Sequence, residues 1–504
     1  MGFIKKNSAF FLSLGIILLF FVSRFYNILG LPIFTDEAIY VRWSQIASND
    51  AAWRFISLTD GKQPMFVWIA MLFMKVIQDP LLAGRLVSVM AGFGSMVGIF
   101  FLTNEVFKNR KAALFASLIY VLYPFSLVYD RLAMYDSLVA MFIIWSLYFE
   151  ILLVRNLRLD LALILGMIIG GGMLTKTSAN FALILLPFSL LLFNFKDKKW
   201  KEKLRKWIVF TLVVVVIANG MYNVLRLSPF FHIIADKNLV FIYSFHEWIQ
   251  HPLEYFMNNI RALLDWLISY TTAPFLVLVV ASFVIGKKYG KEKLLLLTWF
   301  AVPFIALALF GRTLYPRFIL FMMMPLLAMG AYSLYELVNF AKKIWIKALV
   351  VLFFLGIFLV NDFFIVTDFG KASLPQSDRD QFVTGWPAGG GVRESVAILQ
   401  EKSKQGKIYV GTEGTFGLMP SALEIYLGKN PNVIIKGFWP IHETPPQELI
   451  EASKHMPTYF VFYQDCPSCV HVGLSPLSWP VTQVFQIEKE QRGRFYTLYQ
   501  VNPK

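Results

Sequence analysis

The sequence predicts an all-α membrane protein that crosses the bilayer about eleven times and ends in a small α/β domain. The chain of 504 residues is 57% hydrophobic and only 16% charged. Apolar stretches of about 20 residues recur through the first three quarters of the chain and stop near Val366. A soluble core does not explain so many long stretches. We therefore divide the chain into a transmembrane domain at 1–366 and a soluble domain at 367–504.

The spans are placed by length, because roughly 20 apolar residues cross the hydrocarbon core. The apolar run Met65–Ile77 is interpreted as a surface or re-entrant helix, since counting it as a crossing would move all later basic clusters to the opposite side. No small-residue cleavage signature follows the first stretch, so we expect a retained helix there. The expected spans are 9–29, 82–104, 112–129, 134–154, 159–174, 177–195, 207–226, 263–285, 294–311, 318–338 and 348–366.

The basic residues set the predicted orientation. A net charge of +15 could suggest nucleic acid, but here the basic residues form short clusters between apolar spans. Short basic loops mark the cytoplasmic side, and with the amino terminus inside, every cluster falls there. We therefore expect a multi-pass plasma-membrane protein with no nucleic-acid partner. The clusters are Lys5 and Lys6; Lys108, Arg110 and Lys111; Arg155 and Arg158; residues 196–206; residues 287–293; and Lys342, Lys343 and Lys347.

The soluble domain begins with a stretch rich in Gly, Pro, Ser and Asp at 371–391. Strands are expected at 407–410, 432–435 and 459–463, alternating with helices at 394–405, 421–426 and 447–454. This alternation predicts a small α/β domain, which an odd number of spans places outside the cytoplasm. There Cys466 and Cys469 could form a disulfide or remain free thiols; a structural zinc site is disfavoured, because no second cysteine pair exists.

Ionisable residues collect in the loops on the predicted outer side. A charged side chain at membrane depth costs roughly 2.5 to 3.5 kcal/mol, so such residues are usually retained for chemistry or ion pairing. Their gathering on one side predicts a single outward-facing site. The residues are Asp36 and Glu37; Asp60 and Lys62; Asp130, Arg131 and Asp136; Lys176; Arg226, His232, His246 and Glu247; and Arg312 and Arg317.

This set of side chains suits group transfer from a lipid phosphate. A carboxylate can take the proton from an acceptor hydroxyl, and a second acid can orient that hydroxyl or help to hold a divalent metal. Lysine and arginine can stabilise a phosphate as it leaves. The apolar spans provide a wall for the lipid tail.

Four short motifs lie on the predicted outer side: Phe34–Tyr40, Asp60–Pro64, Arg131–Asp136 and Leu174–Lys176. In sequence, order and loop placement they resemble the membrane glycosyltransferases related to protein O-mannosyltransferases and aminoarabinose transferases. The resemblance covers roughly the first 340 residues. It implies a C-type glycosyltransferase fold, a polyprenyl- or dolichyl-phosphate sugar as donor, and inversion at the sugar carbon. The enzyme would be a hexosyl- or pentosyltransferase, such as a mannosyltransferase.

The resemblance also implies roles for individual residues. Asp36 corresponds to the general base, with Glu37 its neighbour in the motif, and Asp136 to the acid near the acceptor or metal. The donor phosphate would be bound by Lys62, Lys176 and Arg317. Where aminoarabinose transferases have a glutamate before the lysine, this chain has Gly61, which leaves open whether the site binds a divalent metal. The candidate ligands are Asp36, Asp136 and His232, with Asp60 as an alternative to His232 in place of the missing glutamate.

Each candidate also has a purely structural interpretation. An acid at the start of a helix caps it or favours its dipole, which applies to Asp36, Glu37 and Asp136. Basic residues at span ends reach toward the interface, which applies to Lys62, Lys176 and Arg317. The alternative function is a transporter or flippase of a lipid-linked or small polar substrate. The sugar, the acceptor (protein, glycan or lipid) and the oligomeric state are not specified by the sequence.

Overall fold

The computed structural model describes residues 8–503 except 286–287, 443, 464–478 and 490–492. The chain forms two compact units. Unit 1 consists of Met1–Tyr26, Ala52–Ile69 and Arg85–Pro375, and unit 2 consists of Asn27–Ala51, Ala70–Gly84 and Gln376–Lys504. Cys466 and Cys469, for which the sequence leaves a disulfide and free thiols open, lie outside the described residues.

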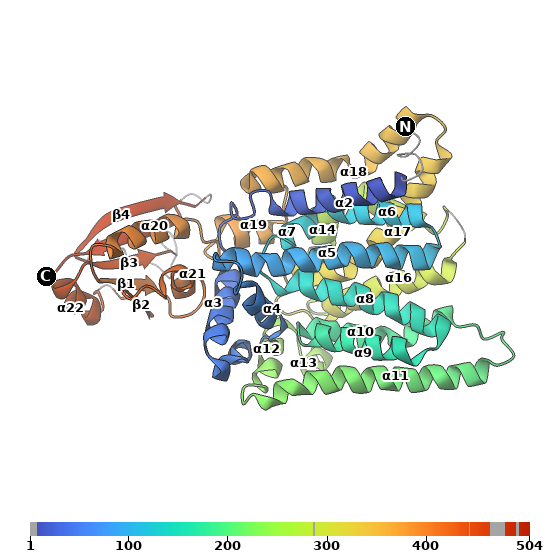
Figure 1. Cartoon of the computed structure of the whole chain (residues 1–504), viewed down its shortest axis with the longest axis horizontal. Helices are drawn as coiled ribbons and strands as arrows, with labels where there is room; N and C mark the ends of the chain where they lie inside the picture. The colour runs from blue at the N-terminus through green and yellow to red at the C-terminus, as the bar shows by residue number, and fades with distance from the viewer. Residues whose placement is uncertain (1–7, 286–287, 443, 464–478, 490–492, 504) are drawn as a thin grey trace. The chain divides into compact units, whose positions relative to one another are not determined.

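Unit 1 is built from helices, several of which run alongside one another (Figure 1). Helix α17 lies at its centre: it packs against α6, α8, α15, α16 and α18, and its residues from Leu320 to Leu334 are all buried. The long helices are α2 (Ser8–Phe25), α5 (Pro80–Phe107, entering from unit 2), α6 (Arg110–Val121), α8 (Tyr135–Asn156), α9 (Leu159–Met173), α11 (Trp200–Tyr222), α14 (Phe256–Thr271), α16 (Gly290–Phe310), α17 (Leu320–Phe340) and α18 (Ile344–Thr367).

Shorter helical segments connect the long helices. Helix α4 begins in unit 1 and is too short to cross a bilayer, as expected for the run Met65–Ile77. The segments are η1 (Ala51–Trp53), η2 (Ile56–Asp60), α4 (Met65–Phe73), α7 (Pro124–Tyr129), η3 (Thr177–Asn180), α10 (Phe181–Leu185), η4 (Leu186–Leu192), η5 (Asn223–Leu227), α12 (Ile233–Phe241), α13 (Phe245–Gln250), α15 (Ala273–Ala281), η6 (Pro316–Ile319) and η7 (Phe369–Lys371).

The multi-pass prediction is confirmed, whereas the count of eleven spans stays a prediction. Within the described chain, six helices are long and apolar enough to span a membrane, and α14 with α15, bent by 94°, could make a seventh span. The expected spans 9–29, 112–129, 159–174 and 177–195 correspond to shorter elements. Proline explains one of these breaks: Pro124 starts α7, and its missing N–H disfavours continuation of α6.

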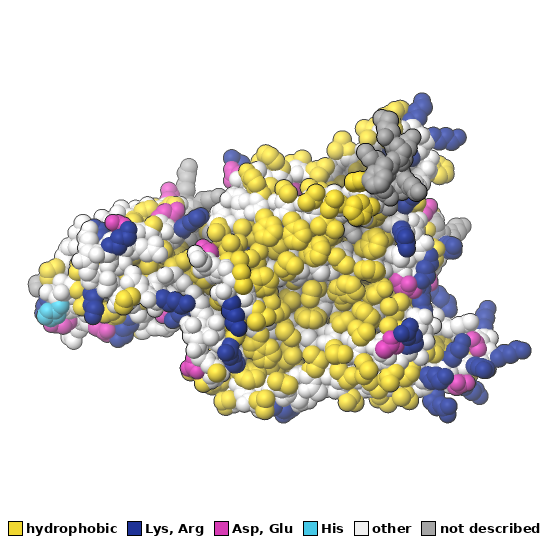
Figure 2. All heavy atoms as spheres, in the orientation of Figure 1, with side chains coloured by type: hydrophobic (Ala, Val, Ile, Leu, Met, Phe, Trp, Pro, Cys, Tyr) yellow, Lys and Arg dark blue, Asp and Glu magenta, His cyan; other side chains and the backbone are white. Residues whose placement is uncertain are grey.

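The surface of the helical unit agrees with a membrane environment. Figure 2 shows hydrophobic side chains over the visible face of the helices, with Lys and Arg side chains gathered at one end of the helices. Helix α18 contributes to the apolar surface through exposed residues such as Leu352, Phe353 and Val360. Basic clustering at one end of the bundle is the pattern that the sequence predicted.

Unit 2 contains a five-stranded sheet in the order β2-β1-β3-β5-β4. β1 pairs in parallel with β2 and β3, whereas β5 pairs antiparallel with β3 and β4. The α/β prediction is confirmed, with each expected strand and helix present and two further strands, β4 and β5. The elements are α3 (Thr35–Asn49), α19 (Gln376–Arg379), the π-helical turn η8 (Asp380–Thr384), α20 (Val392–Ser403), β1 (Ile408–Glu413), α21 (Leu418–Leu427), β2 (Val433–Phe438), α22 (Gln447–His455), β3 (Thr458–Phe462), β4 (Val481–Glu488) and β5 (Phe495–Val501).

A buried lysine follows β4. Lys489 is 6% exposed, and its Nζ donates to the carbonyl oxygens of Gly385 and Trp386 at 3.4 Å each. Burial, reinforced by the nearby positive charge of Arg494, lowers the pKa of Lys489 to about 7 despite the opposing effect of Glu413. A lysine held in this way is largely neutral in the folded domain above pH 7.

Lys489→Met is expected to stabilise the domain at pH 6 and to lose this advantage by pH 10. The folded pKa lies below the unfolded value of about 10.4, so the unfolded chain binds more protons between these values and stability rises with pH. Below pH 7 the full cost of the buried charge is present. Hydrogen exchange of β5 amides in the purified full chain measures the effect, with exposed Lys404→Met as control. An equal gain at both pH values would contradict the burial cost.

Candidate functional site

Lys62 lies directly after η2 in a turn that depends on glycine. Gly61 has a φ of +67°, a region where a side chain causes strain. A Cβ on Gly61 would also lie 2.5 Å from Lys237 Cβ and 2.6 Å from the Ile233 carbonyl oxygen. The backbone N–H of Lys62 closes the turn on Ser57 O at 2.9 Å. The residue that departs from the aminoarabinose transferases is therefore required by the turn that presents Lys62.

Asp136 and Lys176 form an ion pair between two segments of unit 1. Asp136 lies in the first turn of α8 and is 3% exposed. Lys176 precedes η3, and its Nζ donates to Asp136 Oδ1 at 2.6 Å. Such a charge-assisted hydrogen bond is stronger than a neutral one. The structure thus brings together two residues to which the sequence assigned separate roles.

The basic residues predicted to bind the donor phosphate lie against two neighbouring phenylalanine rings. Lys62 Nζ lies 5.0 Å from the ring centroid of Phe241, and Lys176 Nζ lies 4.7 Å from that of Phe318. The two rings are 5.6 Å apart, edge to face. Arg317 Cζ lies 4.6 Å from the Tyr315 centroid and 5.9 Å from that of Phe318. Lys62, Lys176 and Arg317, called here the cation cluster, are therefore gathered around Phe241 and Phe318 by cation–π contacts.

Further polar contacts secure the segments that carry the cation cluster. Lys237 on α12 pairs with Asp60 at 2.6 Å, and Gln63 Nε2 donates to Thr177 Oγ1 at 2.7 Å. Each contact involves a neighbour of a cluster residue. Lys237 and Phe241 were not predicted as site residues. Both residues lie in the same predicted outer loop as His232, which was the one sequence feature that could have pointed to them. No recognisable motif falls on α12.

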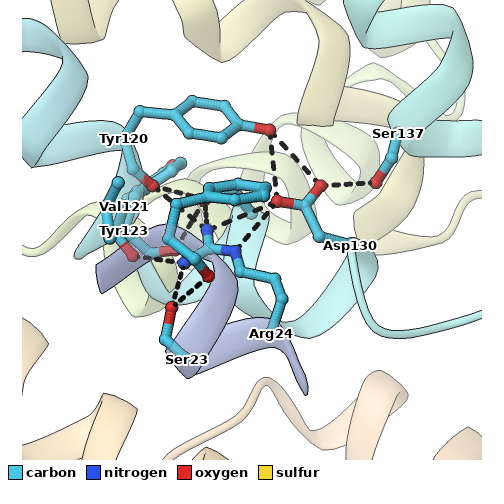
Figure 3. Close-up of polar contacts among 9 residues, drawn as sticks. Ser23, Arg24, Tyr120, Val121, Tyr123, Asp130 and Ser137 are labelled. Atoms are coloured by element: carbon cyan, nitrogen blue, oxygen red, sulfur yellow. Dashed lines mark hydrogen bonds and ion pairs between the residues drawn. The ribbon is translucent and has the colours of Figure 1, made fainter. Parts of the chain in front are cut away.

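A buried polar network lies at the start of α8 (Figure 3). Arg24 and Asp130 are both fully buried, with Arg24 Nη2 and Nε each 3.3 Å from Asp130 Oδ2. Ser137 Oγ donates to Asp130 Oδ1 at 2.8 Å, and the Tyr120 hydroxyl donates to the same carboxylate at 3.3 Å. Ser137 is the residue after Asp136, so the network fixes the first turn of α8 and with it the backbone of Asp136.

Close helix packing makes room for this network. A Cβ on Gly92 of α5 would lie 2.4 Å from Asp130 Cγ. Arg24 Nη1 donates to Val121 O at 2.6 Å, and its Nη2 donates to Ser126 Oγ at 3.2 Å. The guanidinium also lies 4.6 Å from the Phe20 ring centroid. Arg24 therefore joins α2 to the segments around α6 and α7 inside an apolar bundle.

Asp36 and Glu37 belong to unit 2, in the first turn of α3. Glu37 is fully buried, and its Oε2 accepts a hydrogen bond from the backbone N–H of Phe34 at 3.0 Å. This contact caps the helix, as the structural interpretation of Glu37 expects. Asp36 is half-buried beside it. The other predicted site residues, Lys62, Asp136, Lys176, His232 and Arg317, all lie in unit 1.

The residues do not fit the suggested metal site. Asp136 is engaged by the Lys176 ammonium, whose charge competes with that of a metal ion. His232 Nδ1 lies 3.0 Å from the Pro229 carbonyl oxygen on an exposed turn. Among the described residues, no group of three or more His, Cys, Asp or Glu side chains could hold a metal ion. No step of the proposed reaction is therefore assigned to a metal.

Comparisons with known proteins bear on the same region. Residues 61–222, which include Lys62, Asp136 and Lys176, match the family model of dolichyl-phosphate-mannose-protein mannosyltransferases. A comparison with curated proteins finds no match.

Solved structures share the fold of the whole chain. ArnT from Cupriavidus metallidurans in the apo state is 13% identical with a TM-score of 0.61; the comparison covers 99% of this chain and 100% of ArnT. ArnT from the same organism bound to undecaprenyl phosphate is 14% identical with a TM-score of 0.59, and the comparison again covers 99% of this chain and 100% of ArnT. The oligosaccharyltransferase AglB from Archaeoglobus fulgidus, in complex with an inhibitory peptide and a dolichol-phosphate, is 12% identical with a TM-score of 0.55, covering 98% of this chain and 74% of AglB. The chain therefore has an ArnT-like fold and carries a mannosyltransferase-family match at 61–222, which confirms its resemblance to the lipid-phosphate-dependent membrane glycosyltransferases.

Proposed function

We propose that the protein transfers a sugar from a polyprenyl-phosphate donor to an acceptor hydroxyl on the extracytoplasmic side of the plasma membrane. The cation cluster carries this proposal, because it gathers three positive side chains from separate segments beside Asp136. Positive groups fixed in advance stabilise negative charge as it develops. The ligands named for the ArnT and AglB structures, undecaprenyl phosphate and dolichol-phosphate, support a lipid-phosphate donor.

In the proposed reaction the acceptor oxygen attacks the anomeric carbon from the face opposite the phosphate. Its proton passes to the Asp36 carboxylate, the residue that the motif assigns as general base. The bond between the anomeric carbon and the phosphate oxygen breaks, and its electron pair stays on the departing lipid phosphate. Lys62 and Arg317 stabilise that phosphate, while Lys176 holds Asp136. Attack from the opposite face inverts the sugar carbon.

The sugar and the acceptor are proposed at the level of class. The family match at 61–222 favours mannose or a related hexose. The resemblance of the sequence motifs to aminoarabinose transferases keeps a pentose as the alternative. A protein, glycan or lipid hydroxyl would serve as acceptor in the same reaction. Transport is the weaker alternative, because the fold and the family match both belong to transferases.

Lys62→Met is expected to lower kcat/KM for a polyprenyl-phosphate sugar by roughly 10- to 100-fold, because one charge-assisted hydrogen bond to the phosphate is lost. Transfer of labelled sugar in reconstituted membranes measures this, with polyprenyl-diphosphate and nucleotide sugars as comparison donors. The exposed Lys371→Met is the matched control. Wild-type protein that transfers from none of these donors, yet moves a lipid-linked sugar across the bilayer, would favour the flippase alternative.

A further inference from the structure

Helix α3 belongs to the same compact unit as the carboxy-terminal domain, although more than three hundred residues separate them in the sequence. It packs along α21. Nine of its fifteen residues are buried, among them Ala38, Val41 and Ala47. This is the helix whose first turn carries Asp36. The carboxy-terminal domain therefore supports the helix that bears the proposed base.

The backbone immediately before Asp36 is bound to the linker that leads into the sheet. Thr35 donates from its N–H (3.1 Å) and its Oγ1 (3.0 Å) to the carbonyl oxygen of Pro387. Gly389 N–H donates to Ile33 O at 2.8 Å, and Phe34 forms an antiparallel bridge with Ala388. Residues 33–35 and 387–389 thus make a short two-stranded clasp, named the α3 clasp below.

The clasp leaves no space for a side chain at one of its glycines. A Cβ on Gly389 would lie 2.4 Å from Ile33 O, far inside van der Waals contact, whereas a Cβ on the adjacent Gly390 meets nothing within 4 Å. Neither glycine has a φ in the left-handed region. Alanine at these two positions therefore differs in one respect: only Gly389→Ala forces the clasp apart.

Two further contacts fix α3 along its length. Arg42 Nε donates to Glu424 Oε2 at 2.8 Å, and Gln45 Nε2 donates to the carbonyl oxygen of Ile425 at 2.8 Å. Both partners lie on α21, about two turns of α3 from the clasp. A helix held at its start and again two turns later has little freedom to rotate or slide.

We propose that the carboxy-terminal domain is a positioning element of the transferase: through the α3 clasp and the Arg42–Glu424 pair it sets the orientation of Asp36. This rests on the proposed function, in which Asp36 accepts the proton of the acceptor hydroxyl. Thr35, Arg42 and Glu424 are positioning residues in this scheme. Their effect is on the rate of the proton-coupled step, because a displaced base misses the geometry that the step needs.

Gly389→Ala is expected to lower kcat by about 10- to 100-fold, the range that a misplacement near 1 Å can produce, while the KM for the lipid donor changes less than twofold. Gly390→Ala should behave as wild type. Hydrogen exchange of the first-turn amides of α3, measured on the full chain in nanodiscs, should accelerate at least tenfold in Gly389→Ala alone. Unchanged kcat together with accelerated exchange would overturn the positioning role.

A charge swap gives an independent test, including the case in which Gly389→Ala does not fold. Arg42→Glu and Glu424→Arg should each lower kcat severalfold without changing donor KM, and the double variant should recover most of the loss. A double variant no better than either single variant would count against the proposal. If wild type transfers no sugar, the proposed function fails, and the exchange rates of α3 still decide whether the domain holds this helix.

Discussion

Asp36→Asn is expected to lower kcat for sugar transfer by about 10²- to 10⁴-fold, the usual contribution of a general base. Asparagine has nearly the same shape but does not take up a proton at neutral pH. The fold should survive the change, since α3 is capped by Glu37 and held by the clasp through Thr35 and Pro387. A loss confined to kcat would then report on proton transfer.

The measurement is the same transfer assay in reconstituted membranes, with Asp160→Asn as control. Asp160 is an exposed acid in the first turn of α9, paired with Arg158 on the predicted cytoplasmic side, so its loss should leave the activity unchanged. Glu37→Gln is a second comparison, because the amide oxygen still accepts the N–H of Phe34 and the helix cap is kept. Full activity of Asp36→Asn would remove Asp36 from the role of base and direct attention to Asp136.

The sequence predicts the architecture well where local pattern determines it. Apolar length identified the regions of α5, α8, α11, α16, α17 and α18. The alternation of apolar runs and helix-like segments located β1, β2 and β3. It was less successful where short helices fill a predicted span, as at α6, because proline and packing rather than length decide where a helix ends.

The candidate site was likewise predicted only in part: the sequence identified individual residues but not their partners. The resemblance singled out Lys62, Asp136, Lys176 and Arg317, and the structure gathers them around the Asp136–Lys176 pair and the neighbouring rings of Phe241 and Phe318. The roles of these residues stay predictions. The pairing of Lys176 with Asp136 was not predicted, because sequence separation says nothing about which acid a lysine meets. The association of α3 with the carboxy-terminal domain was missed for the same reason.

Arg24 was not predicted as a structurally important residue, although the sequence alone could have indicated it. It lies inside the expected first span, where an arginine is costly unless it is paired. That rule was applied to Asp36 and Glu37 beyond the end of this span but not to a charge within it. The partner, Asp130, lies beyond several other elements, so pairing could be expected while its identity required the fold.

Arg24→Met is expected to cause a large loss of stability. Removal of one partner of a buried ion pair typically costs about 3 to 5 kcal/mol, because the other charge is left without compensation. Here Asp130 would keep only the hydroxyls of Ser137 and Tyr120, and Val121 O and Ser126 Oγ would each lose a donor. Asp130→Asn should destabilise less, since asparagine still accepts these hydroxyl hydrogen bonds and the Arg24 guanidinium keeps the oxygen acceptors of Val121 and Ser126.

The double variant distinguishes two causes of the instability: the uncompensated charge of Asp130 and the lost packing of the Arg24 side chain. If the cost of Arg24→Met arises from the stranded carboxylate, Arg24→Met with Asp130→Asn should be clearly more stable than Arg24→Met alone, a non-additivity expected of groups in contact. Thermal unfolding of the purified chain in one detergent measures all three variants, with the exposed Arg158→Met as control. Strict additivity would show that Arg24 acts through its packing on Phe20 instead.

Because Ser137 joins Asp130 to the turn that holds Asp136, variants that survive purification should also lose transfer activity, and the double variant should lose less than Arg24→Met.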